Sequence, residues 1–252
     1  MIFLLKKGFF NASGDYLFHL LSQSFKSAIT VDAYYLSKYF FCDWIMIAST
    51  FAAFVFSIKF GHQLNGLKLI TIYVVGSLVM DLISIYCEII SPNYRIESFF
   101  MSLFFVFEIT IFFYYISNNI KTAGIRQKLK IFFLTFFVVI LALSLGHILF
   151  AKSLKAWLMA MQFLYVIVPC LIYFIELFRF YQPNLKEHPS FWVVTGILFY
   201  YSSSLPLFIL GDYVFANFHE YLNILNALNY VLYAILFSLF IRAYLCKTKV
   251  QY

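Results

Sequence analysis

The chain has 252 residues, of which 63% are hydrophobic, 12% charged and 23% aromatic. Soluble domains usually carry about 25% charged residues, so a chain with half that share cannot cover its surface in water. The composition therefore excludes a soluble globular protein and indicates an integral membrane protein. The net charge of +7 does not point to nucleic acid, because the 18 Lys and Arg residues are scattered at the ends of apolar runs.

Seven apolar windows are each long enough to cross a bilayer as a helix, which takes about twenty residues. Outer-membrane barrels instead show alternating segments of about ten residues. The sequence therefore predicts an all-α integral membrane protein, a bundle of seven transmembrane helices. The connections are short and contain turn formers such as Gly211-Asp212 before the last window. The predicted spans are residues 39–58, 67–90, 97–117, 129–150, 157–178, 191–210 and 221–244.

A segment of about 38 residues that is neither a span nor plainly disordered precedes the first span. Apolar residues recur on one helical face between Leu17 and Ile29, which predicts an amphipathic helix lying at the membrane interface. The chain is accordingly divided into an N-terminal interfacial segment (1–38), the transmembrane domain (39–246) and a short cytoplasmic tail (247–252). No cleaved signal peptide is expected, because the early lysines follow a very short apolar run.

The distribution of Lys and Arg predicts the orientation. The side that receives the odd-numbered loops and the C-terminus has eleven Lys and Arg residues, and the other side has seven. By the positive-inside rule, the N-terminus is expected outside and the C-terminus in the cytoplasm of a bacterial inner membrane.

Polar residues inside the spans recur at helical spacing. Ser77, Asp81, Ser84 and Glu88 lie at i, i+4, i+7 and i+11 on one face of the second span. Glu108 lies near the middle of the third span, at a depth similar to that of Asp81, roughly 13 to 17 Å from the outer surface. Charged side chains in hydrocarbon are costly and usually face the bundle interior. No span interior offers a Lys or Arg partner, so a shared proton or cation is expected.

These stripes predict a polar pocket that opens to the outside and binds a ligand. The open alternative is that the same groups only form hydrogen bonds between helices. The candidate ligand-binding residues are Asp43, Asp81, Glu88, Glu108, His147, Gln162, Tyr165, Asn223, Asn226 and Asn229.

No cofactor or metal motif stands out. The 4 cysteines occur singly, and the 34 Phe and 20 Tyr residues are spread through every span, so no aromatic cage is predicted. There is no HExxH, GxSxG or Gly-rich phosphate loop, and the case for an enzyme is weak.

Two other functions stay open. Asp81, His147 and His219 are candidate ligands of a metal-dependent lipid hydrolase, although the paired HxxxH of the seven-span ceramidase and adiponectin-receptor type is missing. Asp81 and Glu108 also suit a proton- or cation-coupled transporter, but no inverted repeat is found.

The sixth span contains Pro189-Ser190-Phe191-Trp192, Thr195-Gly196 and Phe199-Tyr200-Tyr201-Ser202. Together with Glu108 and the Asn stripe of the seventh span, it resembles uncharacterised seven-span membrane proteins of bacteroidete-type bacteria, some of which are associated with sensor histidine kinases. The resemblance implies a sensory or signalling component without its own output domain, with membrane lipids and a separate membrane kinase or other signalling protein as partners.

Overall fold

The computed structural model describes residues 44–60, 65–89, 94–150, 155–180, 185–217 and 222–246. In these residues it contains seven long α-helices, two 3-10 turns and no strand. The first helix is described over Trp44–Phe60. It is followed by η2 (Asn65–Leu67), α3 (Lys68–Ile89), α4 (Tyr94–Asn119), α5 (Ala123–Phe150), α6 (Lys155–Arg179), η3 (Leu185–Glu187), α7 (Pro189–Asn217) and α8 (Leu222–Tyr244). The structure confirms the prediction of an all-helical membrane protein. The predicted N-terminal interfacial helix lies outside the described residues.

Three helices are long and apolar enough to cross a membrane, over Met161–Arg179, Pro189–Leu210 and Ile224–Tyr244. Trp44–Phe60 and Leu103–Asn119 are shorter apolar stretches. A helical stretch of 22 residues such as Pro189–Leu210 is about 33 Å long, which matches the thickness of the hydrocarbon core.

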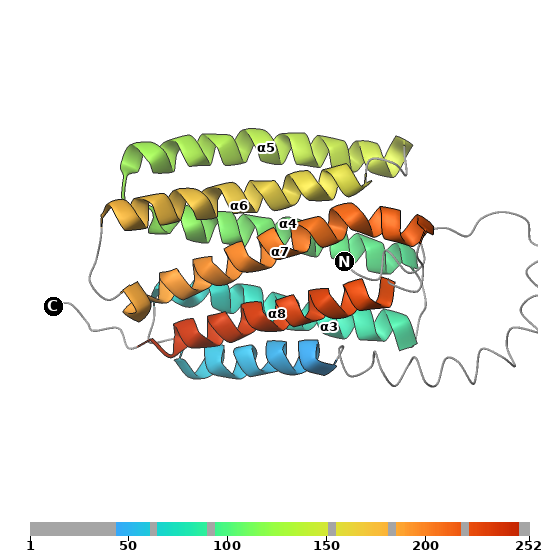
Figure 1. Ribbon diagram of the computed structural model, residues 1–252, viewed down its shortest axis with the longest axis horizontal. Coiled ribbons are helices and arrows are strands. Elements are labelled where there is room, and N and C mark those ends of the chain that lie inside the picture. The colour runs from blue at the N-terminus through green and yellow to red at the C-terminus, as the bar shows by residue number, and fades with distance from the viewer. Residues whose placement is uncertain are drawn as a thin grey trace, which may run out of the picture.

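The helices run side by side along the long axis of the molecule, with α5 at one edge and the Trp44–Phe60 helix at the other (Figure 1). The most extensive pairings are α7 with α8, α6 with α7 and α3 with α4. The helix α4 also packs against α5, α6 and α7, so it occupies a central place in the bundle. Its mid-helix residue Glu108 is thereby carried into the interior.

Many large apolar side chains lie on the outer surface of the bundle, and several polar side chains lie in its largely hydrophobic interior. Large apolar side chains such as Leu82, Leu134 and Ile175 are among the exposed ones, at 59%, 64% and 67% exposure. The buried side chains include the polar residues Thr50, Ser57, Ser77, Glu108, Ser117, Gln162, Glu176, Ser204 and Asn229. This arrangement suits a bundle whose outer surface faces lipid, because hydrocarbon does not solvate polar groups.

Where helix backbones are farther apart, aromatic side chains fill the space. The ring of Tyr73 on α3 lies 6.3 Å from that of Phe237 and 6.0 Å from that of Phe240, both on α8. Near the ends of the same helices, the hydroxyls of Thr71 and Tyr244 are 3.0 Å apart. The α3–α8 contact is therefore made by long side chains, and buried hydroxyls come with it.

One predicted connection is wrong. Gly211-Asp212 was expected to form the turn before the last span, but α7 continues through both residues to Asn217. Glycine is tolerated inside membrane helices, because lipid gives the backbone no alternative partner for its hydrogen bonds. The apolar window therefore marks the lipid-spanning part of this helix and underestimates its length.

The described Lys and Arg residues gather at one end of the bundle. Nine of them lie in or near the helix ends where α4, α6 and α8 finish and α3, α5 and α7 begin: Lys59, Lys68, Lys121, Arg126, Lys128, Lys130, Arg179, Lys186 and Arg242. Only Arg95 and Lys155 of the described residues belong to the opposite end. This end is called the basic end below.

Close packing of α7 on α8 at Gly196 gives a test of the fold. A Cβ atom placed on Gly196 would lie 3.2 Å from Cβ of Leu239 and 3.3 Å from Cδ1 of Leu236. Gly196→Leu must therefore push the two helices apart, and we expect it to lower the free energy of unfolding by about 1–3 kcal/mol. The measurement is reversible unfolding of the detergent-solubilised protein by SDS titration.

Gly124→Leu is the matched control, because a Cβ atom at Gly124 would meet nothing within 4 Å. Equal destabilisation by the two substitutions would contradict the α7–α8 packing described above.

Candidate functional site

Glu108 is a buried carboxylate in the middle of α4. Its side chain is 6% exposed, and Oε1 accepts a hydrogen bond of 2.8 Å from the hydroxyl of Tyr73, which is fully buried on α3. A hydrogen bond to a charged acceptor contributes about 1.5–3 kcal/mol, and a buried polar group without a partner costs a similar amount. This one bond therefore ties α3 to α4 in the interior of the bundle.

Three more tyrosines surround the same carboxylate. The hydroxyls of Tyr200 and Tyr201 on α7 and of Tyr233 on α8 lie within electrostatic range of Glu108. The ring of Tyr200 packs edge-on against that of Tyr201 at 5.3 Å and against that of Tyr233 at 5.6 Å, a favourable aromatic geometry. Tyr73, Tyr200, Tyr201 and Tyr233 are called the tyrosine cluster below.

Asp81 lies on the same face of α3, two turns after Tyr73. Between them Ser77 is fully buried, with its hydroxyl donating to the Tyr73 carbonyl at 3.0 Å. Asp81 lies beside Thr50 of the first helix, and Tyr233 is within electrostatic range of both Asp81 and Glu108. Tyr233 is thus close enough to interact with both carboxylates, whereas Asp81 and Glu108 do not contact each other directly.

Two buried polar atoms of this region have no hydrogen-bond partner among the described residues. They are Oδ2 of Asp81 and the hydroxyl of Tyr201. Among the described residues, no Lys or Arg forms an ion pair with Asp81 or Glu108. A buried unpaired carboxylate oxygen is costly. This region can therefore accept a proton, a cation or a hydrogen-bond donor.

Asn229 on α8 belongs to the edge of the same region. Its Oδ1 accepts a hydrogen bond of 3.0 Å from Ser204 of α7, and both residues lie beside the hydroxyl of Tyr200. Asn229 is 4% exposed, whereas Asn226, one turn earlier, is only half-buried. The side-chain amide of Asn229 thereby links α7 and α8 beside the tyrosine cluster.

Two of the predicted ligand-binding residues, Gln162 and Tyr165, belong to α6. Gln162 is buried. The ring of Tyr165 packs against Phe113, Phe132 and Phe133, and its hydroxyl donates to the Phe133 carbonyl on α5 at 3.2 Å. The expectation that Tyr165 lines the Glu108 pocket is wrong in this respect, because its position on α6 directs it to the α4–α5–α6 interface.

The remaining candidates cannot be placed. Asp43 lies outside the described residues, and so do the side chains of Glu88, His147 and Asn223.

The tyrosine cluster is the part of the site that the sequence did not predict. Tyr73 precedes Ser77 by one turn, so extending the polar stripe of α3 backward would have included it. Tyr201 carries no such signal, because tyrosines occur throughout the spans. Four tyrosines interact with Glu108 through their hydroxyl groups.

Comparisons with protein-family models, curated proteins and solved structures found no match. Within the described parts of the chain, no three His, Cys, Asp or Glu side chains are close enough together to hold a metal ion. The hydrolase alternative depends on His147 and His219, whose side chains are not among those described.

The hydrogen bond to Glu108 gives a second prediction. Tyr73→Phe removes the donor and keeps the ring, so we expect it to lower the free energy of unfolding in detergent by about 1–3 kcal/mol. Tyr86→Phe on the same helix is the control, because Tyr86 is 54% exposed. If Tyr73→Phe were as neutral as the control, Glu108 would not depend on this donor.

Proposed function

We propose that this chain is a seven-span protein of a bacterial inner membrane that binds a small cation at Asp81 and Glu108 and signals through a separate membrane partner. In this proposal the N-terminus is outside and the C-terminus is in the cytoplasm, and the basic end of the bundle is cytoplasmic. The excess of Lys and Arg at that end supports this orientation.

The observation that carries the proposal is the unpaired Oδ2 atom of Asp81. Its surroundings supply oxygen atoms, because Thr50, Ser77 and Tyr233 all have hydroxyls in this part of the interior. Oxygen donors are the ligands of hard cations, and tyrosine ring faces attract organic ammonium groups. The ligand that fits this chemistry is a monovalent metal ion or a small protonated amine.

Binding of a cation would change the packing of three helices. Asp81 on α3 faces Thr50 of the first helix and Tyr233 of α8. A cation between these groups neutralises the carboxylate and adds contacts across both interfaces. A ligand shifts a conformational equilibrium by as much as its affinities for the two states differ. A partner protein that contacts the first helix or α8 would detect that shift.

Cation binding is tested with the purified protein in detergent. Sodium, potassium and methylammonium chloride are added in place of choline chloride at constant ionic strength, and the free energy of unfolding is measured. We expect one of the three cations to raise it in a saturable way, by about 2.7 kcal/mol at a hundredfold excess over the dissociation constant. Asp81→Asn is expected to abolish this stabilisation, and Tyr233→Phe to weaken it.

Glu187→Gln is the matched control, since Glu187 is an exposed acid on η3, away from the interior. Two results would contradict the proposal: no stabilisation by any of the cations, or the same stabilisation in Asp81→Asn as in the unsubstituted protein. Cation flux into vesicles that contain the protein, lost in Asp81→Asn, would show transport in place of signalling.

A further inference from the structure

The hydroxyl of Tyr201 is a buried donor that has no hydrogen-bond partner among the described residues. Its ring is fully buried where three helices meet, edge-on to Phe112 of α4 at 6.1 Å and to Phe163 of α6 at 5.1 Å. The hydroxyl lies within electrostatic range of Glu108, whose Oε1 accepts the hydrogen bond from Tyr73. A buried polar group without a partner costs free energy, so a conformation that brings Tyr201 to Glu108 gains the missing hydrogen bond.

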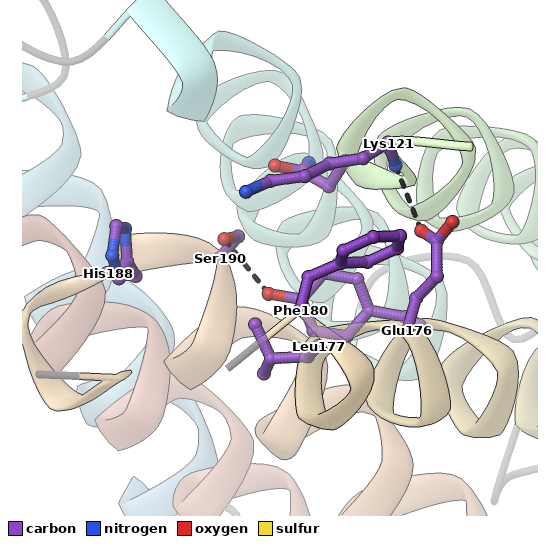
Figure 2. A pocket seen from close by; sticks show the side chains of 8 residues that line it. Lys121, Glu176, Leu177, Phe180, His188 and Ser190 are labelled. Carbon is purple, nitrogen blue, oxygen red and sulfur yellow. Dashed lines mark hydrogen bonds between the residues drawn. The ribbon is translucent and has the colours of Figure 1, made fainter. Parts of the chain in front are cut away.

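A pocket of about 260 Å³ lies beside the start of α7, at the basic end of the bundle. It is bounded by the end of α4, the end of α6 and the first residues of α7 (Figure 2). Glu176 of α6 accepts hydrogen bonds from the backbone N–H groups of Lys121 at 2.9 Å and Thr122 at 2.8 Å, which ties the α4–α5 turn to α6. On the α7 side, the Tyr173 hydroxyl donates to that of Ser190 at 3.0 Å. The pocket therefore gives the start of α7 room to move toward α4.

Proline interrupts α7 shortly after Tyr201. Pro206 has no backbone N–H, so the carbonyl of Ser202 lacks its helical donor. Sharp bends in helices are found mainly at proline. The part of α7 between the basic end and Pro206 can therefore tilt relative to the rest of the helix, and Tyr201 belongs to the part that tilts.

This part of α7 is packed firmly against α8. The two helices are in close contact at Gly196, and near the basic end the Arg242 guanidinium lies 5.5 Å from the centre of the Trp192 ring. Farther along, the ring of Tyr233 on α8 packs edge-on against that of Tyr200 at 5.6 Å. The α8 helix and the tilting part of α7 therefore form one packed unit.

We propose that binding of a cation at Asp81 moves this unit toward α4, so that Tyr201 donates to Glu108 and the pocket at the basic end narrows. The proposal rests on the proposed function, because the bound cation draws the hydroxyl of Tyr233 toward Asp81. The hydrogen bond that Glu108 gains adds to the apparent affinity for the cation. Tyr201 acts through Glu108 and is a positioning residue, and the start of α7 is the part that reports cation binding to a partner.

The test compares Tyr201→Phe with the unsubstituted chain in detergent, with the cation among sodium, potassium and methylammonium that stabilises the protein. In choline chloride, Tyr201→Phe is expected to leave the free energy of unfolding unchanged or to raise it, because the hydroxyl that it removes has no partner. The apparent dissociation constant of the cation is expected to rise roughly tenfold, since one hydrogen bond to a charged acceptor is lost. Tyr114→Phe on α4 is the matched control, because Tyr114 is 51% exposed.

Infrared difference spectra between the cation and choline forms give an independent readout. A tyrosine C–O band is expected to shift when the cation binds, because the Tyr201 hydroxyl gains an acceptor. This shift is expected to be absent in Tyr201→Phe and present in the Tyr114→Phe control.

A third variant tests the movement of α7 without changing the tyrosine cluster. Leu177→Trp places a larger side chain in the pocket, so it is expected to oppose the narrowing and to weaken cation binding. Ile175→Trp is its matched control, because Ile175 is 67% exposed on the same helix and does not line the pocket.

The outcomes separate this inference from the proposed function. If no cation stabilises the unsubstituted protein, the proposed function fails and this inference fails with it. If a cation does so but binds Tyr201→Phe and Leu177→Trp as tightly as their controls, only this inference is overturned. It is also overturned if Tyr201→Phe lowers the free energy of unfolding in choline chloride as much as Tyr73→Phe does, because Tyr201 would then have a partner before the cation binds.

Discussion

The hydrogen bond between Tyr73 and Glu108 is the interaction on which the interior of this bundle depends. Glu108 lies on α4, which packs against α3, α5, α6 and α7, and it is buried without an ion pair to any described Lys or Arg. The hydroxyl of Tyr73 at 2.8 Å gives it a donor from α3. The neighbouring tyrosines of α7 and α8 contact one another, so side chains of four helices meet around this carboxylate.

Three carboxylates in the bundle differ in the hydrogen bonds that they accept. Glu176 accepts hydrogen bonds from two backbone N–H groups at the start of a helix, one to each of its carboxylate oxygens. Glu108 accepts a tyrosine hydroxyl, and Asp81 keeps one buried oxygen without a partner. In a medium of low dielectric constant, the least compensated group has the most to gain from binding a cation. The contrast explains why Asp81, rather than Glu176, is the proposed ligand-binding carboxylate.

The sequence predicted the helices and the inward faces because both depend on periodicity. Apolar runs located the helices, and the spacing of Ser77 and Asp81 placed them on one face. Periodicity gives no information about which neighbouring helix a side chain meets, so Tyr165 was assigned to the wrong interface. The tyrosine cluster was missed for the same reason, since its members come from α3, α7 and α8. The bonds from Lys121 and Thr122 to Glu176 depend on backbone atoms of a turn, which residue types do not specify.

A double-mutant cycle on Tyr73→Phe and Glu108→Met, which removes the acceptor and keeps a side chain of similar length, tests the central claim most directly. The free energies of unfolding of the two single variants, the double variant and the unsubstituted protein are measured by SDS titration in the same detergent. Cycles in membrane proteins average about 0.6 kcal/mol per hydrogen bond, with a maximum of about 1.7. We predict a coupling energy of about 1–1.7 kcal/mol, at the upper end of this range, because the acceptor is a buried carboxylate. Coupling close to zero would contradict the account, because it would mean that Tyr73 and Glu108 stabilise the bundle independently.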